Sequence, residues 1–218
     1  MNNKLKTYKK YSLGKLSDHN YIYNMMKAKH LLYIFLFVMG PATMAQSTAP
    51  LPTSESVMKA AYATAAKEHK NVLLMFHASW CGWCKKMDAS LNDPSVKKMI
   101  DDNYVIAHLD VLEQPAKAAL ENPGSLEMMT KFGGDKAGLP YWLVLDAKGN
   151  VLANSLMPKD GETTVTAKDN VGCPASEKGV SFFDSILKKT SKLKQDDIKV
   201  IHKRFLLNQP TPQPGKTS

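Results

Sequence analysis

Apolar residues change their spacing along this chain, and the changes divide it into candidate strands and helices. The continuous apolar run Val72–Phe76 predicts a buried strand, because it is short and bounded by polar residues. A similar run, Tyr104–Val111, predicts a second strand that we expect to be central in the sheet. Apolar residues at helical spacing follow Ser54, a suitable N-cap, and predict a helix that ends near His69. A further helical pattern runs from Cys84 to Leu91.

Candidate elements continue through the second half of the chain. We predict short helices at 96–100, 115–121 and 125–132, a β-hairpin formed by 141–146 and 151–154, and amphipathic helices at 180–193 and 195–207. The polar stretch between the hairpin and the last helices predicts a long loop. A length of 218 residues and an apolar content of 44% fit one globular domain with extensions.

Basic residues are concentrated at the beginning of the chain. Residues 1–45 hold seven lysines and a single acidic residue, Asp18. The net charge of +9 for the whole chain therefore falls to +3 for residues 46–218, which carry 22 basic and 19 acidic residues. The basic balance is a property of this leader, so we expect no nucleic-acid partner.

Residues 25–45 have the three parts of a secretory signal peptide. A positive segment around Lys27 and Lys29 precedes the apolar core Leu31–Met39, and small residues lead to Ala45, after which we expect cleavage. The core is far shorter than the roughly 20 residues that span a bilayer, although an uncleaved membrane anchor is the alternative. We expect a periplasmic or secreted protein that meets the membrane only during export.

The remaining boundaries follow from composition. Residues 1–24 are polar and lysine-rich and precede the signal, so we expect them to be a non-native upstream extension. Residues 46–53 contain two prolines and predict a linker. We place the folded domain at 54–207 and a disordered, proline-rich tail at 208–218.

Cys81 and Cys84 are separated by two residues and follow the first predicted strand. This position places Cys81 at the first turn of a helix, where free amide groups and the helix dipole stabilise a thiolate. Lys85 and Lys86 add positive charge nearby. The two thiols are within reach of each other across one helical turn, so they can close a disulfide and reopen it by exchange. We assign Cys81 as the attacking nucleophile and Cys84 as the resolving thiol.

Other uses of a cysteine pair leave different signals. A zinc site would have only Cys173 as a third thiol, and no second CxxC follows. Covalent haem attachment is excluded, because a lysine and not a histidine follows Cys84. Copper binding by the two thiols with His77 and nearby methionines is chemically allowed, as is a purely structural disulfide. We expect a redox dithiol with no metal and no cofactor.

Two segments carry a family resemblance. The sequence FHASWCGWCK at Phe76–Lys85 resembles the active-site segment of the thioredoxin superfamily. The segment Gly138–Leu152 resembles the family's cis-proline loop, the strand after it, a turn and the next strand. The resemblance covers roughly Val57 to Ala153. It implies a thioredoxin-like three-layer α/β fold with a central mixed β-sheet flanked by helices, here with an extra C-terminal helix.

The resemblance also implies how a substrate is held. The Leu139–Pro140 bond is expected to be cis and to lie against the dithiol, leaving the Leu139 backbone free to pair with an extended segment. The alternative is a trans proline that opens a strand. Trp83 replaces the family's common proline between the cysteines, and with Gly82 and Trp80 it is expected to contact the substrate. Trp80 is equally suited to packing.

The resemblance leaves the proton transfer to the resolving thiol unassigned. Thioredoxin has a buried acid for this step at the position that Met75 occupies here. His77, His108 and Asp110 are therefore candidates for proton handling, although each also suits a structural role at a strand end. Cys173, in the long loop, is a third redox thiol, an intermolecular link or a passive residue.

These patterns and the resemblance together predict an exported thiol–disulfide oxidoreductase. Its substrates would be protein thiols and disulfides, and a membrane electron donor or acceptor would be its partner. The alternative is a non-enzymatic thioredoxin-fold protein that binds copper or a protein partner through the same thiols.

Overall fold

The computed structural model describes residues 50–159, 161–162 and 164–210. The predicted upstream extension, the signal peptide, the first half of the linker and residues 211–218 lie outside this range. Within it, no helix has the length and apolar character that crossing a membrane requires.

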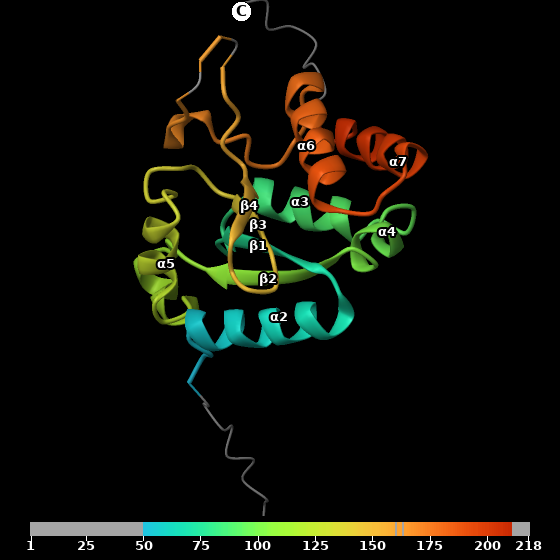
Figure 1. Cartoon of the computed structure of the whole chain (residues 1–218). Helices are drawn as coiled ribbons and strands as arrows, with labels where there is room; N and C mark the ends of the chain where they lie inside the picture. The colour runs from blue at the N-terminus through green and yellow to red at the C-terminus, as the bar shows by residue number, and fades with distance from the viewer. Residues whose placement is uncertain (1–49, 160, 163, 211–218) are drawn as a thin grey trace, which may run out of the picture. The chain divides into compact units, whose positions relative to one another are not determined.

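Four strands form one mixed sheet in the order β2-β1-β3-β4 (Figure 1). β1 (Asn71–His77) pairs in parallel with β2 (Tyr104–Asp110) and antiparallel with β3 (Tyr141–Leu145). β3 also pairs antiparallel with β4 (Val151–Asn154), which confirms the predicted hairpin at one edge. The expectation that residues 104–111 form a central strand is wrong. β2 lies at the other edge of the sheet. Because it has a neighbouring strand on one side only, all but three of its residues are half-exposed.

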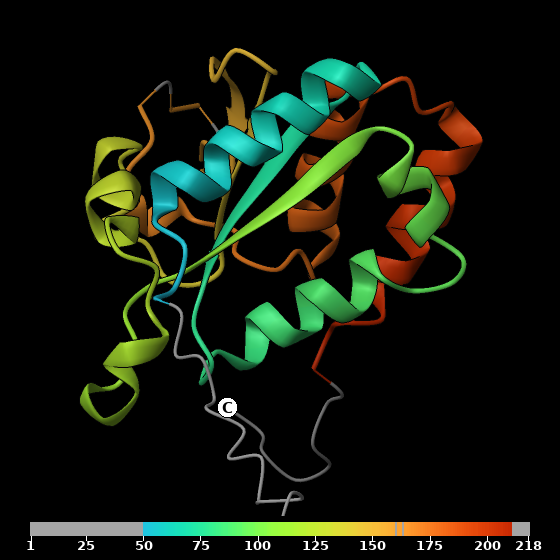
Figure 2. The same cartoon turned by 90° about the horizontal axis from the view of Figure 1, so that it is seen from below.

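The helices cover both faces of this sheet. They are α2 (Ser54–Glu68), α3 (Gly82–Leu91), α4 (Lys97–Asp101), α5 (Ser125–Lys131), α6 (Glu177–Thr190) and α7 (Gln195–Leu206), with 3₁₀ helices η1 (Pro115–Leu120) and η2 (Ala167–Asp169). Figures 1 and 2 show α2 on one face and α3 with α6 and α7 on the other. This arrangement is the expected three-layer α/β fold, and α7 is the expected additional C-terminal helix.

Alternation along the strands divides the core into two halves. Leu73 and Met75 of β1 pack toward α3 and α6, whereas Val72, Leu74 and Phe76 pack toward α2. All five side chains are at most 2% exposed, because β1 has a paired strand on each side and helices on both faces. β1 is therefore a fixed support for the loop that leads to Cys81.

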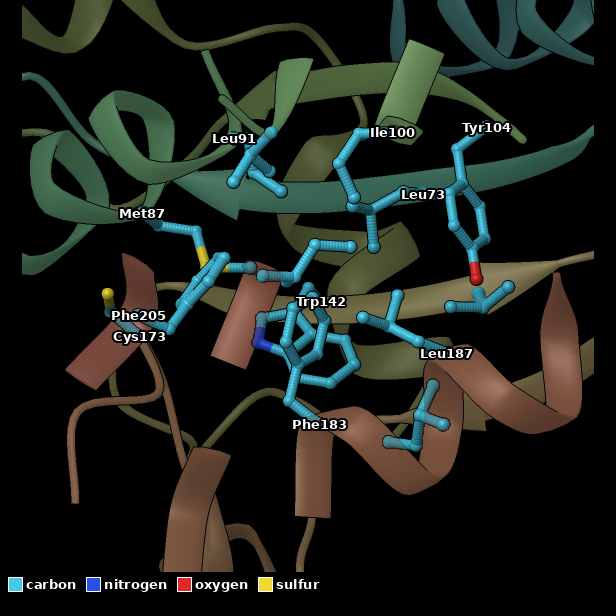
Figure 3. Packing of buried hydrophobic residues seen from close by; sticks show 14 of the residues in the cluster. Leu73, Met87, Leu91, Ile100, Tyr104, Trp142, Cys173, Phe183, Leu187 and Phe205 are labelled. Atoms are coloured by element: carbon cyan, nitrogen blue, oxygen red, sulfur yellow. The ribbon is translucent and has the colours of Figure 1, made fainter. Parts of the chain in front are cut away.

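The core half under α3, α6 and α7 is built around two aromatic side chains (Figure 3). Trp142 of β3 meets Phe183 of α6 edge to face, with ring centroids 5.4 Å apart. Phe183 also lies 4.9 Å from the ring of Phe205 on α7. Trp142 Nε1 donates a hydrogen bond of 2.8 Å to the carbonyl of Gly172, so the buried indole is satisfied and the long loop is fixed to the sheet.

Two of the predicted boundaries that differ from the observed ones lie at the ends of the folded domain. The N-cap of α2 is Thr53 and not Ser54: the Thr53 hydroxyl accepts the Ser56 N–H, while the Ser54 N–H is used by the carbonyl of Pro123. The domain also continues past residue 207. Asn208 is 6% exposed and its amide donates to Ser90 Oγ at 2.8 Å, so it packs in the domain and is not part of the tail.

Candidate active site

Cys81 and Cys84 form a disulfide at the beginning of α3. The S–S distance is 2.06 Å, and the Cα atoms are 5.3 Å apart. Cys81 is the N-cap of α3: its backbone is extended and its Sγ accepts the Cys84 N–H at 3.1 Å. An N–H donor aimed at this sulfur at a helix N-terminus is the environment that stabilises a thiolate.

Two exposed indoles flank the disulfide. Trp80 is 49% and Trp83 is 41% exposed, although both are large and apolar. Trp80 Nε1 donates to the carbonyl of Leu112 at 2.8 Å, which fixes this ring on the loop after β2. Lys86 Nζ lies 4.3 Å from the ring centroid of Trp83 and adds a positive charge over its face.

The Leu139–Pro140 peptide bond is cis, and the loop that contains it adjoins the disulfide. Leu139 packs against a small buried cluster of Ala78, Cys81 and Cys84. No sequence pattern predicts the side chain that holds this loop. Asn170 Nδ2 donates to the carbonyls of Gly138 and Pro140, the second at 3.1 Å.

Asn170 belongs to the predicted long loop between the hairpin and the last helices. This loop contacts Pro140 through Asn170 and Gly172. The Asn170 side chain also accepts the N–H of Gly172 at 3.1 Å. Gly172 has a positive φ of 62°, and a Cβ there would lie 3.7 Å from Pro140 Cδ. A lone asparagine in a polar loop gives no periodic signal, so only the folded structure reveals this contact.

A second unpredicted residue, Glu113, holds the loop that precedes Cys81. Its carboxylate accepts the backbone N–H of Ser79 and, at 2.8 Å, the Ser79 hydroxyl. Burial alone would raise the pKa of Glu113, but the two Ser79 hydrogen bonds and the charge of Lys117 outweigh it and lower the pKa. Glu113 therefore stays ionised and ties the loop after β2 to the active-site loop.

The three residues predicted to handle protons lie together, and Asp88 contacts one of them, His108. His77 Nε2 lies 3.4 Å from Asp110 Oδ1, and its ring is 4.8 Å from the ring of His108. His108 Nε2 is 2.9 Å from Asp88 Oδ1. His77 Nε2 is buried and makes no hydrogen bond. Burial, and then the charge of His108, lower the pKa of His77 despite Asp110, Asp88 and Glu113.

This histidine cluster lies on the α3 side of the sheet. Met75 is 1% exposed and pairs in register with His108, so both side chains project from the same face. Asp88 follows Cys84 by four residues on α3, which is one helical turn. The cluster is thus connected to the helix that carries Cys84.

Cys173 is a free cysteine in the core of the domain (Figure 3). It is 5% exposed, and the Asn208 amide approaches its sulfur at 3.5 Å. Burial raises the pKa of this thiol to about 12, so it is protonated at neutral pH. Burial and a raised pKa favour a passive residue over a third redox thiol or an intermolecular link. In the part of the chain that the structure describes, no three His, Cys, Asp or Glu side chains converge as a metal would require.

A family model for a thioredoxin-like domain matches residues 58–168, slightly more than half of the chain. The chain belongs to the thioredoxin-like family. The match contains the cysteine pair and Pro140 and ends two residues before Asn170. The expected superfamily is therefore confirmed, and residues 169–210 of this thioredoxin-like protein extend beyond the matched domain.

Curated relatives match shorter segments. A protein disulfide-isomerase from Hordeum vulgare is 34% identical over 58 residues, which cover 27% of this chain and 11% of that protein. Protein disulfide isomerase-like 1-3 from Oryza sativa subsp. japonica is 38% identical over 74 residues, or 33% of this chain and 13% of that one. The thioredoxin-like chain thus spans about a tenth of the length of the curated relatives it matches.

Solved structures with related sequences include two bacterial proteins. The C-terminal domain of DsbD from Neisseria meningitidis, in its oxidised form, is 30% identical with a TM-score of 0.36 and covers 48% of this chain and 84% of that one. A disulphide isomerase from Xylella fastidiosa Temecula1 is 28% identical, also with a TM-score of 0.36, and covers 44% and 68%.

Proposed function

We propose that this protein is a thiol–disulfide oxidoreductase that acts on protein substrates through Cys81 and Cys84. The observation that carries the proposal is the disulfide at the N-terminus of α3, where the Cys81 sulfur caps the helix. A passive cross-link needs neither a helix N-terminus nor two exposed indoles beside it. Both features suit a pair that opens and exchanges with a partner.

The exchange proceeds in two steps when the pair is reduced. The Cys81 thiolate attacks one sulfur of a substrate disulfide, forms a mixed disulfide and releases the other substrate sulfur, which takes up a proton. The Cys84 thiol then loses its proton and attacks Cys81 Sγ, which releases the second substrate thiol. Two electrons and two protons have passed to the substrate, and a dithiol donor must return them. The reverse sequence oxidises a substrate dithiol.

The surface around the thiols would hold the substrate chain. We assign the Leu139 backbone and the adjoining Pro140 to pairing with an extended segment. Trp83 and Trp80 would contact its apolar side chains, because both rings are exposed beside the disulfide. Gly82 leaves the surface between the thiols open, since a Cβ there would meet no atom within 4 Å.

We assign the proton of the resolving thiol to the histidine cluster. His108 is held by Asp88, one turn after Cys84, and His77 with Asp110 lies behind it. His77 Nε2 is buried and has no hydrogen-bond partner among the described residues, so it can accept a proton without first breaking a hydrogen bond. This arrangement would allow a proton to leave the site through two imidazoles as Cys84 becomes a thiolate.

The site of action belongs to the same proposal. Residues 25–45 have the composition of a signal peptide, so we place the protein in the periplasm or outside the cell, with cleavage after Ala45. That compartment is oxidising, and a dithiol there needs a dedicated partner, for which a membrane electron donor or acceptor is suited. Recovery of a mature protein that begins at Gln46 tests the export, and an uncleaved leader would contradict it.

Three matched substitutions test the activity. We expect Cys81→Ser to abolish reduction of a protein disulfide in a dithiothreitol-driven assay. Cys84→Ser should instead accumulate a mixed disulfide with the substrate, detected by mass spectrometry and released by reductant. Cys173→Ser is the control, because its buried thiol is outside the exchange. Full turnover by Cys81→Ser would refute the proposal.

A further inference from the structure

A groove of about 700 Å³ begins beside the disulfide and continues along the segment that wraps the cis-proline loop. We call it the side groove. Trp83, Gly138 and Leu139 line the end that adjoins the active site, and Val171, Ala175 and Gln209 line its continuation. Since the family match ends at residue 168, one wall of the side groove is built by residues outside the matched domain. A groove of this size fits several residues of an extended chain.

The charge of the side groove has one sign. Among the residues that the structure describes, its lining contains Lys136 and Lys168, both exposed, and no acidic side chain. Asp169 follows Lys168, but its carboxylate is 4% exposed and is engaged by Thr166 and by Lys159 at 3.3 Å. The two ammonium groups therefore face an occupant, and no carboxylate among the described lining residues compensates their charge.

The floor suits a polypeptide backbone. At Gly138 a Cβ would meet no atom within 4 Å, so the groove is open above this residue, whose carbonyl is held by the Asn170 amide. Leu139, Met157 and Val171 supply apolar surface beside it. Open space over Gly138, apolar contacts and flanking cations together match an extended peptide that carries acidic side chains.

We propose that the side groove binds an acidic segment of the protein substrate next to the cysteine under attack. The proposal rests on the proposed exchange activity and deepens it by naming the substrate class. Continuity with Trp83 and Leu139 connects the segment to the disulfide, and Lys136 with Lys168 favours glutamate or aspartate side chains along it. The protein would thus reduce disulfides in acidic surroundings faster than those in basic ones.

Two peptides of equal length test the preference. Each carries one cysteine in a disulfide with the same chromogenic thiol, flanked by glutamates in one peptide and by lysines in the other. At low ionic strength we expect the reduced protein to react about tenfold faster with the acidic peptide, and the ratio to shrink as salt is added. The double variant Lys136→Glu/Lys168→Glu should bring the ratio to one or below.

The matched control is Lys59→Glu/Lys67→Glu on α2, which changes the net charge equally on the far face of the sheet. It should keep both the acidic preference and its rate with a small uncharged disulfide. Equal rates for both peptides, or an equal loss in the control, would overturn the inference while leaving the exchange activity intact. Failure to reduce any disulfide would overturn the exchange activity and this inference with it. A chain ending at residue 210 that accelerates with both peptides alike would identify its own tail as the occupant and refute the inference.

Discussion

Replacing Asn170 with alanine tests whether the cis-proline loop is held by the segment that follows the matched domain. The side chain makes three hydrogen bonds to backbone groups, donating to Gly138 and Pro140 and accepting from Gly172. A typical intramolecular hydrogen bond contributes about 1 kcal/mol net. Gly138 is exposed, so water can replace its bond, whereas Pro140 is buried. We therefore expect Asn170→Ala to lower the free energy of unfolding by about 2 kcal/mol.

The same change should weaken substrate binding. The loop that pairs with the substrate would lose its support, so the KM for a protein disulfide should rise several-fold. The rate with a small disulfide should stay unchanged, because it needs only Cys81 and Cys84. Unfolding in urea gives the free energy of unfolding, with the same denaturant dependence (m-value) used for both proteins. Steady-state kinetics with the protein disulfide and the small disulfide gives the ratio of the two activities.

Asn103→Ala is the matched control. Its side chain also bridges backbone groups, donating to Met99 at 2.9 Å and accepting the Lys192 N–H at 2.8 Å, but on the far side of the domain from Cys81. It should lose similar stability and leave the substrate ratio unchanged. The reasoning would be refuted if both variants shifted the ratio equally, or if Asn170→Ala retained wild-type stability.

Three further predictions concern the core, the histidine cluster and the thiol of Cys173. Phe183→Ala should cost about 3–5 kcal/mol in denaturant unfolding, because the ring is fully buried between Trp142 and Phe205; a loss below 1 kcal/mol would contradict this packing. The lowered pKa of His77 means that the unfolded state binds its proton first, so stability should fall as the pH drops below about 6.5. His77→Gln should reduce this dependence of stability on pH, as measured by unfolding curves across this pH range. An unchanged dependence would contradict the lowered pKa of His77. Cys173, with a pKa of about 12, should resist iodoacetamide in the native protein at neutral pH, as intact-mass analysis would show; rapid alkylation would contradict its burial.

Local patterns in the sequence were sufficient for most elements that position the site. The apolar run at Val72–Phe76 became β1, and Cys81 lies at the start of α3 as its spacing predicted. The hairpin and the last two helices also appear, with ends shifted by a few residues. These features depend on residues close in sequence, so the spacing of apolar residues and the residue types in turns predict them.

The features that were missed depend on contacts between distant residues. Glu113 is 34 residues from Ser79, and Asn170 is 30 residues from Pro140. Neither residue type predicts a distant backbone partner. The misplaced strand β2 has the same origin: a continuous apolar run indicates burial, but strand order depends on which strands pair. The sequence indicated the histidines and Asp110 at the strand ends as candidates, but not the contact of Asp88 with His108.

The reduction potential of the Cys81–Cys84 pair tests the central claim most directly. The protein is equilibrated in glutathione or dithiothreitol buffers, the thiols are alkylated, and mass spectrometry gives the fraction of the protein that is oxidised. An exchange enzyme should titrate reversibly between about −270 mV, the reductant end, and about −120 mV, the oxidant end. A disulfide that stays closed in dithiothreitol would be a structural cross-link and would contradict the account.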